Sequence, residues 1–121
     1  MVNKKLSRLK FISLPLVLLF CCFSKISLAE NKLLMITAEY CVYCMIWEKE
    51  IGEIYPKTDL AKSYPLQKIE IEDLKNFQNE NVRKTNITPT FIFLNDEKEK
   101  GRITGYSNPE MFWWQVDEII N

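Results

Sequence analysis

Apolar residues change their spacing along the chain, and each change predicts a different element. Residues 32–37 form a short apolar run without helical spacing, which predicts a buried strand. From about residue 42 the spacing becomes three or four, which predicts a helix that ends near Tyr55-Pro56. The apolar face of this helix consists of Cys44, Trp47, Ile51 and Ile54.

The central part of the chain contains a second strand and a long polar connection. Ile69 and Ile71 alternate with charged residues between 67 and 72, which predicts a half-buried strand. Residues 57–65 before it are expected to form a loop with a helical turn. Residues 73–84 after it are polar and amide-rich, and are expected to form a short helix or an irregular connection.

The C-terminal part predicts a hairpin and a closing helix. Residues 90–94 are β-branched and aromatic and predict a third strand, which a charged turn joins to a fourth strand over 101–106. Asn108-Pro109-Glu110 has the composition of a helix start, and the helix runs to about Ile120. Strands linked through helices and followed by a hairpin indicate an α/β domain: a mixed four-stranded sheet with helices on both faces.

Residues 1–29 have the composition of a secretory signal peptide. Four cations precede an apolar run from Phe11 to Phe23, and Ser27-Leu28-Ala29 provides small residues for cleavage after Ala29. The alternative is an uncleaved membrane anchor, but the run is shorter than the roughly 20 residues that a spanning helix needs. We therefore expect residues 30–121 to be the mature domain, exported to the periplasm.

Cleavage after Ala29 changes both the charge and the cysteine content. The full chain has 16 cations and 16 acids; five of the cations and none of the acids lie in residues 1–29, which leaves a net charge of −5. That surface gives no reason to expect nucleic-acid binding, which needs a basic footprint. Cys21 and Cys22 leave with the signal peptide, so the mature domain keeps only Cys41 and Cys44.

Cys41 and Cys44 form a C-x-x-C pair that directly follows the first predicted strand and begins the first predicted helix. This arrangement is typical of a thiol–disulfide active site. Unpaired N–H groups at a helix start stabilise a thiolate, so we assign the attacking role to Cys41 and the resolving role to the more buried Cys44. A zinc site would need two further ligands, and no histidine or other cysteine remains to supply them.

One alternative is a structural disulfide in a redox-inert binding module. A disulfide that closes so short a loop contributes little stability, so the spacing favours chemistry. A second motif, Thr88-Pro89-Thr90, precedes the third strand, where proline can be a plain strand start or a cis residue that faces the cysteines.

These segments together resemble the thioredoxin superfamily over nearly all of residues 31–121. The string C-V-Y-C-M-I-W-E-K-E-I-G-E-I-Y-P-K-T, followed by I-T-P-T-F, is similar to the SoxS-type periplasmic thioredoxins of the bacterial sulfur-oxidation system. The resemblance implies a thioredoxin-like fold, Cys41 as nucleophile, Cys44 as resolving cysteine and Pro89 as a cis proline. Substrate would bind at Tyr40, Val42, Tyr43, Thr88 and Pro89.

The resemblance also implies partners. We expect a monomer without a cofactor that exchanges disulfides with cysteine-containing exported proteins, in particular the sulfur-carrier protein of the sulfur-oxidation system. A membrane thiol-reductant donor would return it to the reduced state. The other enzyme interpretation is a periplasmic oxidant or a cytochrome c maturation thioredoxin.

Two positions depart from the common thioredoxin pattern, and several others have two interpretations. Tyr40 stands where W-C-G-P-C has tryptophan, and Met35 stands where ordinary thioredoxins bury an acid that accepts a proton. Glu39 could substitute for that acid, but we interpret it as a solvated loop residue. Trp47 is interpreted as a core residue of the helix, and of Trp113 and Trp114 we expect one inside and one partly exposed.

Overall fold

The structure, a computed structural model, describes residues 30–121. The signal peptide predicted for residues 1–29 lies outside the described residues. The strands are β1 (Lys32–Thr37), β2 (Leu66–Glu70), β3 (Thr90–Asn95) and β4 (Lys98–Thr104). The helices are α1 (Val42–Trp47), α2 (Asp59–Ser63) and α3 (Pro109–Ile120), with a π-helix η1 (Glu48–Gly52) and two 3₁₀ turns, η2 (Tyr55–Lys57) and η3 (Leu74–Asn76). In this range no helix is both long and apolar enough to cross a membrane.

The four strands form one mixed sheet, as the sequence predicts, and their order is β2-β1-β3-β4. β1 pairs in parallel with β2 and antiparallel with β3, and β3 pairs antiparallel with β4. The residue pair Ile36 and Thr90 places the end of β1 beside the start of β3. The segments that follow β1 and precede β3 therefore meet at one end of the sheet.

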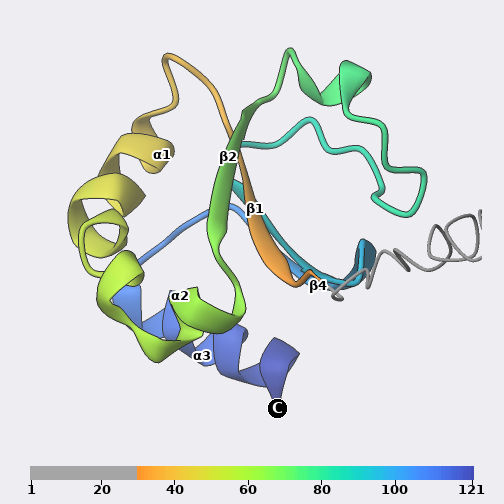
Figure 1. Ribbon diagram of the computed structural model, residues 1–121. Coiled ribbons are helices and arrows are strands. Elements are labelled where there is room, and N and C mark those ends of the chain that lie inside the picture. The colour runs from red at the N-terminus through yellow and green to blue at the C-terminus, as the bar shows by residue number, and fades with distance from the viewer. Residues whose placement is uncertain (1–29) are drawn as a thin grey trace, which may run out of the picture.

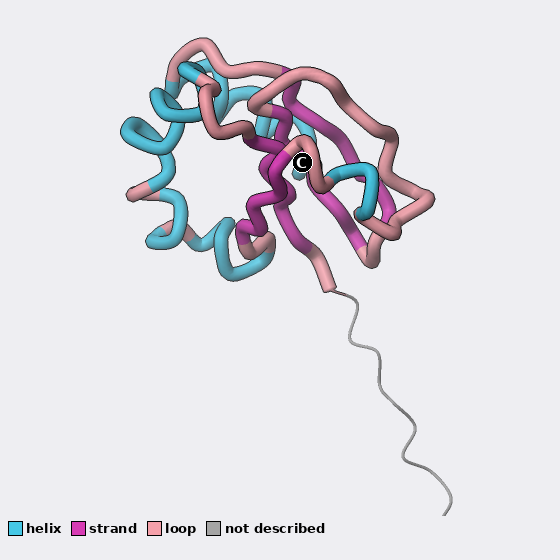
Figure 2. Tube along the Cα trace, turned by 90° about the horizontal axis from the view of Figure 1, so that it is seen from above, coloured by secondary structure: helices cyan, strands magenta, loops and turns pink. Residues whose placement is uncertain are grey.

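The central strands are buried on both faces, so each strand contributes alternate residues to two apolar clusters. On one face Leu33, Met35, Phe91 and Phe93 pack against α1, α2 and α3. On the other face Leu34, Ile36, Ile92 and Leu94 are covered by residues 69–82, whose only helical element is η3. Figures 1 and 2 show the three α-helices on one side of the sheet and this irregular segment on the other.

The helix after Cys41 differs from the prediction at its end. A π-helical turn, η1, follows α1 and turns the chain more slowly than an α-helix. The apolar face therefore continues through Ile51 to Tyr55, which is fully buried, whereas Ile54 is 53% exposed. The prediction that Ile54 belongs to this face is wrong, because it assumed a regular helical period.

The hairpin is tighter than the sequence indicates. Asp96 and Glu97 both have positive φ, 50° and 64°, so two residues turn the chain and β4 begins at Lys98 instead of residue 101. β2 likewise ends at Glu70 instead of residue 72. Positive φ angles such as those of Asp96 and Glu97 are uncommon for residues other than glycine, so the charged residues before 101 predicted a longer turn.

The closing helix starts and faces as predicted. Asn108 is the N-cap of α3, where its side chain accepts a 2.9 Å hydrogen bond from the N–H of Met111, and Pro109 takes the first position. Phe112 and Val116 are buried against the sheet. Of the adjacent tryptophans, Trp113 packs on the core and Trp114 is 60% exposed, as expected.

Candidate active site

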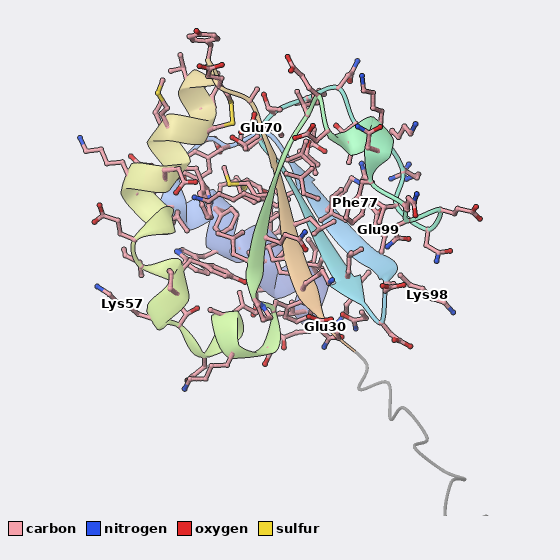
Figure 3. The ribbon with its side chains drawn as sticks, turned by 45° about the horizontal axis from the view of Figure 1, so that its top comes forward. Glu30, Lys57, Glu70, Phe77, Lys98 and Glu99 are labelled. Atoms are coloured by element: carbon pink, nitrogen blue, oxygen red, sulfur yellow. A yellow bond between two sulfur atoms is a disulfide. The ribbon has the colours of Figure 1, made fainter. Side chains whose placement is uncertain are left out.

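Cys41 and Cys44 form a disulfide at the start of α1, with their Cα atoms 5.2 Å apart. The chain leaves β1 at Thr37 and turns through Ala38, whose carbonyl accepts a 3.2 Å hydrogen bond from the N–H of Cys41. The pair therefore lies just beyond the carboxyl end of a central strand. Figure 3 shows this end of the sheet, near Glu70, with sulfur atoms beside the first turn of the helix, while Glu30 lies at the opposite end.

Cys41 is the N-cap residue of α1, and its sulfur takes the part that a side-chain oxygen has in most caps. The N–H of Cys44 donates a 3.1 Å hydrogen bond to Sγ of Cys41. This N–H would otherwise be one of the unpaired donors at the helix start, and it favours negative charge on the sulfur that it contacts. Cys44 is 3% exposed and Cys41 9%, in the order that the sequence predicts.

Aromatic side chains belong to the same buried apolar cluster as the two cysteines. Trp47 is fully buried, with its ring centroid 4.9 Å from that of Phe91 and 5.8 Å from that of Phe112. The interpretation of Trp47 as a core residue is therefore confirmed. Its indole N–H has no hydrogen-bond acceptor among residues 30–121, and nothing in the structure explains this.

The Thr88–Pro89 peptide bond is cis, and it lies at the same end of the sheet as the disulfide. Pro89 is buried, and its carbonyl accepts a 2.7 Å hydrogen bond from the N–H of Gly105 in the loop after β4. Phe91, two residues further on, belongs to the same apolar cluster as both cysteines. The structure thus brings together the two motifs that lie 45 residues apart in the sequence.

Several apolar side chains next to the two motifs in the sequence are exposed. Tyr40 is 88% exposed, and Val42 and Tyr43, the two residues between the cysteines, are also exposed. Sequence reasoning selected these three residues, but it missed Met45 on the next turn and Ile87 before Thr88, which are exposed as well. The one signal for Ile87 in the sequence is its position two residues before Pro89.

Comparison with known proteins agrees with this geometry. No family model matches the chain. The crystal structure of the periplasmic thioredoxin SoxS from Paracoccus pantotrophus superimposes with a TM-score of 0.67 at 32% identity, over 75% of this chain and 96% of that one. The chain belongs to the thioredoxin superfamily. Together with a C-x-x-C pair at disulfide distance, membership makes this protein a thiol–disulfide oxidoreductase.

More distant thioredoxins share the fold. The thioredoxin of Malassezia sympodialis matches with a TM-score of 0.58 at 15% identity, over 74% of this chain and 77% of that one. The thioredoxin NaTrxh of Nicotiana alata matches with a TM-score of 0.55 at 23% identity, over 75% of each chain. The mixed sheet predicted from the sequence is therefore the thioredoxin arrangement.

Position 35 is a methionine in this thioredoxin, whereas the common pattern buries an acidic side chain there. Met35 is fully buried in the apolar cluster that contains both cysteines. Glu39 is exposed, as we expected, and lines a hollow of about 290 Å³ with Glu70, Ile71, Glu72 and Asp73. Within the described residues, no three histidine, cysteine or acidic side chains are grouped so that they could hold a metal ion.

Proposed function

We propose that this thioredoxin works in the periplasm as a reductant of cysteine-containing exported proteins. The observation that carries the proposal is the Cys41–Cys44 disulfide, with the N–H of Cys44 directed at Sγ of Cys41. The similarity to a periplasmic SoxS thioredoxin supports the compartment. The export signal expected in residues 1–29 is part of the proposal.

The reaction proceeds by two exchanges. In the reduced protein the Cys41 thiolate attacks one sulfur of the partner's disulfide, forms a mixed disulfide and releases the partner's first thiolate. The Cys44 thiolate then attacks Sγ of Cys41, which releases the partner's second thiol and forms the Cys41–Cys44 disulfide. Two electrons and two protons pass to the partner, and a membrane thiol-reductant donor restores both thiols.

Cys41 suits the first step for two physical reasons. It is the more exposed of the two sulfurs, and it receives the backbone N–H that stabilises a thiolate. Cys44 is enclosed by the aromatic cluster and becomes reactive only toward the neighbouring Sγ. This division of roles keeps the resolving thiol away from other partners.

The partner binds across the exposed apolar surface around the disulfide. Tyr40, Val42 and Tyr43 contact its side chains, while Thr88 and Pro89 border the path of its backbone. We propose the sulfur-carrier protein of the sulfur-oxidation system as the main partner, following the resemblance to SoxS-type thioredoxins. The protein acts as a monomer in this proposal.

A trapping experiment tests the roles of the cysteines. The variant Cys44→Ser should accumulate a mixed disulfide between Cys41 and the disulfide form of the purified sulfur-carrier protein, visible on a non-reducing gel and removed by dithiothreitol. The matched variant Cys41→Ser should accumulate none, because its remaining thiol is buried. Equal trapping by the two variants, or none by either, contradicts the proposal.

The reduction potential tests the direction of electron flow. Equilibration with glutathione should give a value near that of a thioredoxin-like reductant, about −270 mV. A value near about −120 mV, typical of a strong oxidant, would instead identify the protein as a disulfide donor.

A further inference from the structure

Three hydrogen bonds close a ring just before the cis proline. The N–H of Ile87 donates to Oγ1 of Thr85 at 3.2 Å, and Oγ1 of Thr90 donates to the carbonyl of Ile87 at 2.7 Å. The two hydroxyl oxygens are themselves 3.2 Å apart. We call Thr85, Ile87 and Thr90 the threonine ring.

The two hydroxyls of the ring share their acceptors. The Thr90 hydroxyl lies 2.7 Å from the Ile87 carbonyl, and the Thr85 hydroxyl has two acceptors within reach, Oγ1 of Thr90 at 3.2 Å and the Ile87 carbonyl at 3.5 Å. With either acceptor, the two hydroxyls and the N–H and C=O of Ile87 form one connected set of hydrogen bonds. Bonds arranged in this way polarise one another, and Thr90 is fully buried, where such bonds are strongest.

The ring fixes the backbone on one side of the cis peptide bond. Both backbone polar groups of Ile87 are held by it, and on the other side the Pro89 carbonyl is held by Gly105. Between these two anchors lies Thr88, whose own N–H and C=O have no hydrogen-bond partner within residues 30–121. The side chain of Ile87 is 49% exposed.

We propose that Thr85 and Thr90 are positioning residues that hold Ile87 and Thr88 ready for the partner. The unpaired backbone groups of Thr88 pair with an extended segment that carries the partner's cysteine, and Ile87 contacts an apolar side chain of that segment. The inference rests on the proposed function, in which the partner's backbone passes Thr88, and adds to it the two threonines that hold this loop in position. Neither threonine touches the reacting sulfurs.

The test compares a protein disulfide with a small one. Thr85→Val keeps the size of the side chain but removes two hydrogen bonds of the ring. With insulin as the protein disulfide, its kcat/KM should fall about five- to tenfold, mainly through KM, because bonds of this kind are each worth about a factor of five. Reaction with 5,5′-dithiobis(2-nitrobenzoic acid), which has no backbone to pair, should be unchanged. Thr85→Ser should restore the wild-type values.

Thr58→Val is the matched control. The hydroxyl of Thr58 also makes two hydrogen bonds, donating to Tyr55 O at 2.7 Å and accepting the N–H of Ala61 at 3.2 Å, but at the start of α2. The Thr58→Val variant should have a lower unfolding temperature, but its reactions with insulin and with the small disulfide should both be unchanged. Amide exchange at Ile87, slow in the wild type and fast in Thr85→Val, shows that the ring has opened.

Two outcomes would contradict the inference. If the ring opens and insulin reduction is unchanged, the ring does not position the loop. If both reactions slow equally, Thr85 supports the disulfide region as a whole. Should Thr85→Val fail to fold, Thr85→Ala takes its place with the same expectations. A wild-type protein that is inactive toward both disulfides refutes the proposed function instead.

Discussion

The hydroxyl of Tyr106 donates a 2.6 Å hydrogen bond to Oε2 of Glu50, 56 residues earlier in the chain. Glu50 belongs to η1, which continues the helix that starts at Cys41, and Tyr106 lies in the loop between β4 and α3. The neighbouring Gly105 holds the Pro89 carbonyl from the same loop. Two consecutive residues therefore fasten both sides of the active site, the helix and the cis-proline segment.

Replacing Tyr106 by phenylalanine should weaken this connection. The change removes one hydrogen bond to a carboxylate but keeps the ring that packs against Phe112, so we expect a loss of about 1–2 kcal/mol in the free energy of unfolding. Urea denaturation measures it. A double-mutant cycle with Glu50→Ala should give a coupling energy of about 1 kcal/mol. Additive effects would mean that the two side chains do not interact in solution.

Gly105 has a φ of +81°, a backbone conformation that favours glycine, and a Cβ placed there would meet no atom within 4 Å. Gly105→Ala should therefore destabilise the protein by about 1–2 kcal/mol through backbone strain alone. Gly105→Asn should cost less, because asparagine tolerates left-handed angles better. Thermal unfolding of both variants checks this order, and an alanine variant as stable as the wild type would contradict it.

Alkaline pH should destabilise the protein through its buried tyrosines. Burial raises the pKa of Tyr55, whose hydroxyl donates a 2.6 Å hydrogen bond to the carbonyl of Tyr64. In the unfolded chain the pKa is about 10, so above that pH the unfolded state loses a proton that the folded state keeps. The stability due to this group is complete below about pH 10 and declines above it, by up to about 1.4 kcal/mol per pH unit.

The variant Tyr55→Phe isolates this effect from the titration of lysines. It should be less stable than the wild type at neutral pH, because the Tyr64 carbonyl loses its donor, and its stability should fall less steeply above pH 10. Free energies of unfolding measured from pH 7 to 11 give both slopes. Parallel curves for the two proteins would show that Tyr55 ionises equally in both states.

Much of the fold and the central pair of the site could be predicted from local patterns. The bounds of β1, the start of α3 at Asn108 and Pro109, and the position of Cys41 at a helix start all depend on residues within a few positions of one another. The element order then restricted the sheet to a mixed α/β arrangement. These features depend on residues close together in the sequence, so local patterns are enough to predict them.

Other predictions failed because a regular period was assumed where the backbone is irregular. The π-helical turn moved the buried face from Ile54 to Tyr55, and the two positive φ angles at Asp96 and Glu97 shortened the hairpin turn. The sequence predicted helices on both faces of the sheet, and on the second face the structure has one 3₁₀ turn and loops. Apolar spacing does not reveal such local departures.

The sequence by itself therefore determined which two sulfurs form the disulfide and that a sheet supports them. Only the tertiary structure decided how the segments beside the site are held: the threonine ring and the bond from Tyr106 to Glu50. The physical reason is the range of the contacts. A C-x-x-C pair meets within one helical turn, whereas Tyr106 and Glu50 meet only after four strands and their helices have packed into one core.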